Sequence, residues 1–213
     1  MRDSLRQILL SRRSKAIVFV ICLTPLAWLV RRAYNGNLTA NPVEFVQHFT
    51  GDWTLRFLLI TLSVTPLRKL LNLPDLIRFR RMLGLFAFFY VCLHFLTYRW
   101  PDQNFDLAGM WKDVVKRPFV TVGFLGFVLL IPLALTSTKG WIRRLGGKRW
   151  RALHRLIYFS ALSGVIHYYW LVKSDHRLPL LYGAILAILL LYRLTISLFK
   201  PRPAVAVSPS PAP

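Results

Sequence analysis

The chain has 213 residues, of which 55% are hydrophobic, and its mean hydropathy is +0.45. The hydrophobic residues occur in long uninterrupted blocks, which are typical of helices that cross a bilayer. The net charge is +21, and because the basic clusters lie at the ends of these blocks, they indicate membrane topology and contact with anionic lipid rather than nucleic-acid binding.

Residues 1–15 form a basic N-terminal arm, predicted to be cytoplasmic, ahead of the first apolar block at residues 16–30. The arm and block together resemble a signal peptide. However, the block ends in Arg31 and Arg32 with no small-residue cleavage site, so we expect a retained signal anchor that serves as the first span.

Six apolar blocks predict an all-α, polytopic bundle of about six transmembrane helices. The blocks cover residues 16–30, 53–67, 82–98, 119–137, 153–171 and 179–199. The second block gives the weakest signal because it is short and contains Arg56 and Pro66. The transmembrane domain is therefore expected at residues 16–199, which leaves no room for a soluble catalytic domain. The Pro/Ala/Ser-rich residues 200–213 are expected to form a disordered cytoplasmic tail.

The distribution of Lys and Arg among the loops predicts that both termini are cytoplasmic. Two loops, after the second and fourth blocks, are rich in base: Arg68, Lys69, Arg78, Arg80, Arg81, Lys139, Arg143, Arg144, Lys148, Arg149 and Arg151. The opposite loops are poorer in base, and we assign to them six of the eight acids: Glu44, Asp52, Asp102, Asp106, Asp113 and Asp175.

Several cofactor motifs are absent from the sequence. There is no G-x-G-x-x-G or Walker pattern, so the chain shows no nicotinamide or nucleotide site of its own. There is no C-x-x-C-H, so a haem would be bound non-covalently. The two cysteines, Cys22 and Cys92, both lie in apolar blocks, where they are expected to pack as small apolar side chains.

Three of the five histidines lie in predicted spans: His94 in the third, and His154 and His167 in the fifth. His48 and His176 are assigned to loops as exposed polar residues. A histidine inside a membrane forms either an interhelical hydrogen bond or a functional site. Three histidines on two helices favour a metal or haem site, and the absence of carboxylates from both spans argues against zinc or di-iron.

The depths of the histidines predict which of them pair. His94 lies 12 residues after Met82, and His167 lies 14 residues after Leu153. At about 1.5 Å per residue, these spacings place both side chains about 18–21 Å from the cytoplasmic face. Two imidazoles at one depth on two helices are suited to hold one haem iron from both sides.

His154 lies 13 residues before His167, far enough for a second haem nearer the cytoplasm. On a straight helix the two side chains would point about 140° apart. No histidine of the third span matches the depth of His154, where Arg80 and Arg81 stand instead. A second haem would use another axial ligand, or Gly164 would permit a local bend, and the sequence leaves both possibilities open.

Eight stretches of the sequence resemble the MsrQ family, formerly called YedZ, of ferric-reductase-like membrane proteins. They occur in the family's order between about residues 40 and 173. The stretches are QHFTG (47–51), TPLRKL (65–70), LIRFRRMLGL (76–85), LHFLTY (93–98), KRPFVTVG (116–123), LALTST (133–138), GKRWRALHRLIY (147–158) and IHYYWLVK (166–173).

The resemblance implies a multi-pass protein of the bacterial inner membrane that binds one or two b-type haems through His94, His154 and His167. It implies transfer of electrons to a periplasmic molybdopterin partner that reduces methionine sulfoxide in oxidised proteins. The implied donor is the quinone pool or a cytosolic flavin reductase, and FMN is associated with the family. The chain would then be an electron-transfer subunit and no enzyme on its own.

Two other functions compete with this hypothesis. A stand-alone ferric reductase would need a nucleotide and flavin domain, for which the chain has no motif. A transporter with histidines as proton relays would be expected to carry acids within the spans, and we place all eight acids outside them.

Overall fold

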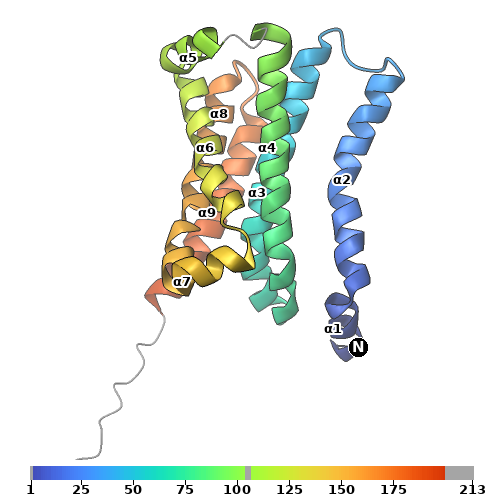
Figure 1. The fold of residues 1–213 in the computed structure, drawn as a ribbon, viewed down its shortest axis with the longest axis vertical. Helices are drawn as coiled ribbons and strands as arrows, with labels where there is room; N and C mark the ends of the chain where they lie inside the picture. Colours follow the sequence, from blue (N-terminus) through green and yellow to red (C-terminus); the bar gives the residue numbers. More distant parts are fainter. Residues whose placement is uncertain (1, 104–106, 200–213) are drawn as a thin grey trace, which may run out of the picture.

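The computed structural model describes residues 2–103 and 107–199, and every regular element in these two ranges is helical (Figure 1). In chain order the elements are α1 (Arg2–Leu10), α2 (Arg12–Tyr34), α3 (Pro42–Leu70), η1 (Pro74–Phe79), α4 (Arg80–Gln103), α5 (Leu107–Lys116), α6 (Pro118–Leu135), α7 (Lys139–Leu153), α8 (Leu156–Leu171) and α9 (Arg177–Leu198). The predicted disordered tail, residues 200–213, lies outside the described residues.

The six predicted spans correspond to the six long helices α2, α3, α4, α6, α8 and α9, which run along one bundle (Figure 1). The predicted all-α membrane helix bundle is therefore confirmed. By length and composition, α2, α6 and α9 are each apolar enough to cross a membrane. The helix α8 has only 16 residues, fewer than the about 20 that cross a bilayer untilted.

Helix α3 is longer than the second apolar block because it begins at a strong polar cap. The Asn41 side chain accepts a hydrogen bond from the Glu44 backbone amide at 3.3 Å, and Pro42 occupies the first turn. This start corrects two assignments from the sequence. His48 lies in α3 rather than in a loop, and Asp52 lies inside the helix rather than outside it.

The basic segment after the fourth span also differs from the prediction, since it forms the helix α7 instead of a loop. Gly146 interrupts this helix with a φ of 73°, in the left-handed region that glycine adopts without strain. In Figure 1, α7 lies across the end of the bundle that also holds α1, and α5 lies at the opposite end. His176 lies in the connection between α8 and α9, as predicted, at the N-cap position of α9, but it is half-buried rather than exposed, and its Nδ1 atom is buried.

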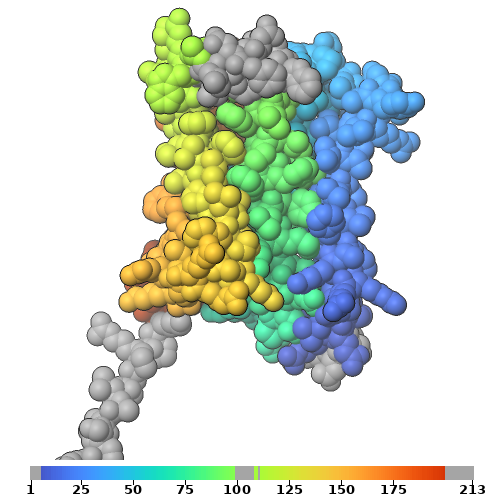
Figure 2. Space-filling model, in the orientation of Figure 1, coloured from blue at the N-terminus to red at the C-terminus, as the bar shows by residue number. Residues whose placement is uncertain are grey.

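Helix α2 lies against one edge of the bundle (Figure 2). Its main polar anchor is the buried Tyr90 of α4, whose hydroxyl accepts from the Leu26 amide at 3.1 Å and donates to the Cys22 carbonyl at 3.0 Å. An undisturbed α-helix joins these two backbone groups directly. The tyrosine hydroxyl therefore bridges the Leu26 amide and the Cys22 carbonyl, in the turn of α2 that contains Pro25.

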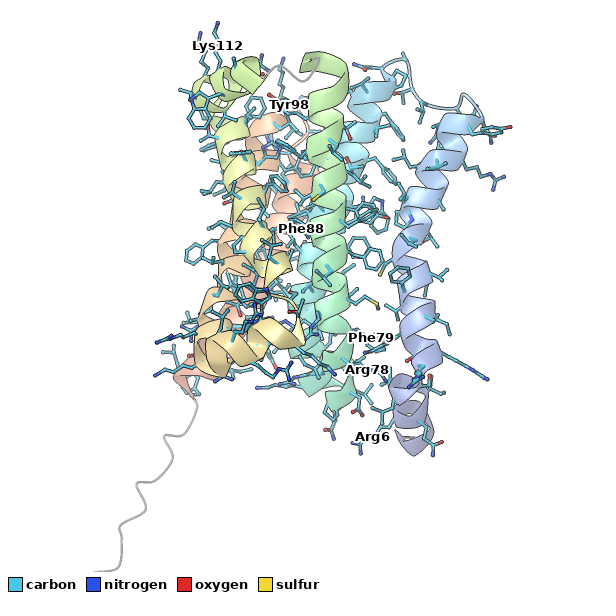
Figure 3. All side chains as sticks on the ribbon, in the orientation of Figure 1. Arg6, Arg78, Phe79, Phe88, Tyr98 and Lys112 are labelled. Atoms are coloured by element: carbon cyan, nitrogen blue, oxygen red, sulfur yellow. The ribbon has the colours of Figure 1, made fainter. Side chains whose placement is uncertain are left out.

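The N-terminal arm is helical and packs against η1. Arg6 pairs with Asp75 at 3.1 Å, and Arg78 donates hydrogen bonds to the backbone carbonyls of Leu9 and Ser11. Figure 3 shows Arg6, Arg78 and Phe79 together at this end of the bundle. At the other end, the Tyr98 hydroxyl of α4 donates to Asp113 of α5 at 2.8 Å.

Candidate functional site

The structure brings the imidazoles of His94 of α4 and His167 of α8 close together inside the bundle, in an edge-on arrangement. Their ring centroids are 6.1 Å apart, and the ring planes make an angle of 76°. A metal–imidazole bond is about 2 Å long, and a ring nitrogen lies roughly 1 Å from its ring centre, so two imidazoles on one metal atom have centres about 6 Å apart. The spacing therefore fits one metal atom held between the two rings.

Backbone carbonyls fix both imidazoles in the same way. The Nδ1 atom of His94 lies 2.9 Å from the Gln47 carbonyl oxygen of α3, and that of His167 lies 2.6 Å from the Phe119 carbonyl oxygen of α6. A carbonyl only accepts, so each Nδ1 carries the hydrogen. Each neutral imidazole then presents the lone pair of Nε2, the atom that binds a metal when Nδ1 is held by a carbonyl.

Two glycines allow these imidazoles to approach the neighbouring helices, and neither was predicted from the sequence. A Cβ at Gly123 would lie 2.6 Å from Nδ1 of His167, and a Cβ at Gly51 would lie 3.1 Å from Nδ1 of His94. Each glycine follows its carbonyl residue by four positions, or one helical turn: Gln47 and Gly51, Phe119 and Gly123. The only signal in the sequence was this repeated spacing, within the stretches QHFTG and KRPFVTVG.

The two imidazoles line a cavity enclosed mainly by α3, α4, α6 and α8. Most of its wall is aliphatic or aromatic, as in the Phe95–Phe127 stack at 5.0 Å and the Phe88–Phe127 stack at 6.2 Å beside it. Figure 3 shows Phe88 at mid-height in the bundle. The apolar residues of the wall include Leu55, Leu58, Val91, Phe95, Val120, Phe124, Phe127, Leu130 and Leu171. Such a wall suits the flat, apolar face of a large ring.

Asp52 also lines this cavity, which corrects the placement of every acid outside the spans. Its carboxylate lies 3.8 Å from Arg56 and shares a hydrogen bond with Tyr168. In the described ranges no hydrogen bond or ion pair joins Asp52 to His94 or His167. The acid therefore belongs to a network with Arg56 and Tyr168 at the wall of the cavity.

His154 stands apart from the pair, in the turn between α7 and α8. Its ring stacks on Trp150 at 3.8 Å between centroids, and its Nε2 lies 3.1 Å from the Thr136 hydroxyl. Burial and the positive charges of Arg80 and Arg81 lower the pKa of His154 from 6.5 to about 4, so the ring is neutral at physiological pH. Among the described residues no second imidazole faces it.

Comparisons with known proteins agree with this arrangement. Residues 50–165 match the family described as ferric reductase like transmembrane component. The protein-methionine-sulfoxide reductase heme-binding subunit MsrQ of Herminiimonas arsenicoxydans is 56% identical over 181 residues, which are 84% of this chain and 83% of that protein.

Two further relatives carry the same description. The MsrQ of Caulobacter vibrioides is 52% identical over 177 residues, covering 83% of this chain and 84% of its own. That of Azospira oryzae is 48% identical over 202 residues, covering 93% and 87%. No solved structure matches the chain. Identity at this level, over most of both chains, places this protein in the MsrQ family of ferric-reductase-like membrane proteins.

Proposed function

We propose that this chain is the haem-carrying membrane subunit of a methionine sulfoxide reductase system. It would carry electrons from the quinone pool or a cytosolic flavin reductase across the bacterial inner membrane. The acceptor would be a periplasmic molybdopterin partner that repairs oxidised proteins. The observation that carries the proposal is the His94–His167 pair, at a spacing for one metal atom and with both Nδ1 atoms held by carbonyls.

The residues around the pair fit a b-type haem. When bound, the haem would supply a one-electron redox centre within the membrane. His94 and His167 would bind it from two helices, and the Gln47 and Phe119 carbonyls would keep both rings in one tautomer and orientation. The apolar wall would exclude water. Neither imidazole needs to change its protonation when one electron passes, because each Nδ1 hydrogen is already held by a carbonyl.

The surroundings of His154 do not fit a second haem as they stand. The ring is stacked on Trp150 and in contact with Thr136, and no second histidine among the described residues lies opposite it. We retain His154 as a proposed haem ligand on the family resemblance, with an unassigned partner on the other side of the iron. FMN also belongs to the proposal by resemblance alone.

The direction of electron transfer is tested in liposomes with purified protein. Because the sequence contains no nucleotide-binding motif, NADPH alone will fail to reduce the haem, whereas adding a flavin reductase or a reduced quinone will reduce it. Pre-reduced protein will be reoxidised by the molybdenum partner plus methionine sulfoxide, followed by absorbance. Rapid reduction by NADPH without a second protein would contradict the proposal and indicate a self-sufficient reductase.

The proposed topology has six spans, with both termini in the cytoplasm. The support for it is that α1 and the basic helix α7 lie at the same end of the bundle, as the positive-inside rule expects for cytoplasmic segments (Figure 1). Alkaline phosphatase fused to the C-terminus will be inactive, because the enzyme matures only in the periplasm. The same enzyme inserted after Thr39, between α2 and α3, will be active. An active C-terminal fusion would exclude this topology.

A further inference from the structure

A cluster of positive charge lies between four helices, away from the His94–His167 cavity. Arg193 of α9 donates a hydrogen bond from Nη1 to the Tyr158 hydroxyl of α8 at 2.8 Å. Its Nη2 donates to the Leu62 carbonyl of α3 at 2.6 Å, and its guanidinium carbon lies 5.2 Å from the centre of the Tyr158 ring. Arg80, the first residue of α4, is near enough to interact electrostatically with both Tyr158 and Arg193.

This cluster has no negative partner among the described residues. Arg80 is repelled by both Arg193 and Arg68. The four ion pairs of the described ranges use Asp75, Glu44, Asp52 and Asp113, and none of them reaches this cluster. Arg68, Arg80 and Arg193 are half-buried, and like charges held close together in such a setting destabilise a protein unless an anion compensates them.

One polar atom of the cluster, and a second on the adjoining turn of α3, have hydrogen-bonding capacity left over. The Nε atom of Arg193 and the hydroxyl of Thr65 are both buried without a hydrogen-bond partner. Thr65 lies on α3 between Leu62, which binds Arg193, and Arg68, about one turn from each. Buried donors are normally paired, so the unused Nε of Arg193 beside uncompensated positive charge indicates a ligand with acceptor oxygens.

We propose that Arg80, Arg193 and Tyr158 form a binding site for a phosphate group. A phosphate offers three or more acceptor oxygens to donors that come from different helices, and the guanidinium fork matches it. Arg80 begins α4 at the end of the bundle that holds α1 and α7 (Figure 1). Basic pockets between spanning helices at the cytoplasmic side suit phospholipid head groups, and a soluble phosphate is the other source of the same chemistry.

Native mass spectrometry tests the site without reference to haem. The full-length protein is reconstituted in phosphatidylglycerol or phosphatidylcholine nanodiscs, released into detergent and weighed. In a second arm, thermal unfolding is compared in inorganic phosphate and in chloride at equal ionic strength. Wild-type protein will retain phosphatidylglycerol over phosphatidylcholine, will be stabilised by inorganic phosphate, or will show both effects.

Arg193→Gln and Arg80→Gln will each weaken this retention or stabilisation about tenfold or more, because each removes a charged donor. Arg193→Lys keeps the positive charge but lacks the planar set of guanidinium donors, so its lipid retention and its stabilisation by phosphate will lie between those of wild type and Arg193→Gln. The control is Arg149→Gln on the exposed side of α7, which will behave as wild type. Because Arg193 and Arg80 lie on different helices, one variant still tests the site if the other fails to fold.

The outcomes separate the two sources. Retained phosphatidylglycerol without an effect of inorganic phosphate identifies a lipid site, and stabilisation by inorganic phosphate alone identifies a soluble ligand. Equal behaviour of wild type, Arg193→Gln and Arg80→Gln in both arms overturns the proposal. The readouts are lipid retention and the effect of inorganic phosphate, measured on samples of equal haem content, so failure of this proposal leaves the proposed electron-transfer function untouched.

Discussion

Protein carrying His94→Ala or His167→Ala will lack the same low-spin haem. Each substitution removes one of the two imidazoles whose ring centres lie 6.1 Å apart, and the remaining one can bind iron from one side only. Haem content per protein and the low-spin signal in electron paramagnetic resonance measure the effect. We expect complete loss of this signal in either variant, and the double variant will show no further loss.

The other histidines serve as matched controls. His176→Ala will keep the full haem content, because His176 caps α9 away from the cavity, whereas His48→Ala tests a histidine that lines the cavity without facing the pair as a second-helix ligand and will keep the low-spin signal. His154→Ala will keep the His94–His167 signal and will remove or weaken a separate, more cytoplasmic haem. An unchanged low-spin spectrum in His94→Ala would show that the pairing is wrong.

Gly123→Ala will disturb the site almost as severely as loss of the ligand. The new Cβ would stand 2.6 Å from Nδ1 and 2.9 Å from Cγ of His167, which is closer than real Cβ contacts. The ring must therefore turn away and give up its bond to the Phe119 carbonyl. Loss of such an outer-shell partner typically costs about 10- to 100-fold in metal affinity. Haem titration and conversion from low spin to high spin measure the result.

Gly51→Ala provides a graded comparison, since its Cβ would lie 3.1 Å from two ring atoms of His94. We expect this variant to retain haem with a shifted spectrum. Gly84→Ala is the control, because its Cβ meets only Thr61 at an ordinary 3.6 Å. Alanine is a better helix former than glycine by about 1 kcal/mol, so helix propensity cannot explain a loss at Gly123. Equal haem affinity in all three variants would contradict the role of the glycines.

The six long helices were predictable from the sequence because lipid forces each spanning segment to satisfy its own backbone, which produces long apolar blocks. The start of α3 was missed because the prediction followed hydropathy. Asn41, Pro42 and Glu44 carry a capping signal that was available in the sequence. Helix α7 was missed because it is basic and interrupted by Gly146, so it resembles a loop in composition although it forms a helix across the end of the bundle.

The candidate site was predictable in part. Equal depth along two helices predicts that His94 and His167 lie together, and their rings do lie at a spacing that suits one metal atom. The carbonyls of Gln47 and Phe119 were beyond prediction, because any residue type supplies a backbone carbonyl. The sequence predicts that no histidine of the third span lies opposite His154, but the prediction from helical phase was wrong because His154 lies in the turn between α7 and α8 rather than on the helix of His167.

The two halves of the haem cradle enter the membrane at different times during synthesis. Helices α3 and α4 supply Gln47, Gly51 and His94, whereas α6 and α8 supply Phe119, Gly123 and His167. A nascent chain that has inserted only as far as α6 offers a single imidazole and an unfinished apolar wall. The pair proposed to hold a haem is complete only once α8 has inserted, so haem loading at this site would be a late step of biogenesis. Chains stalled before residue 167 would remain colourless.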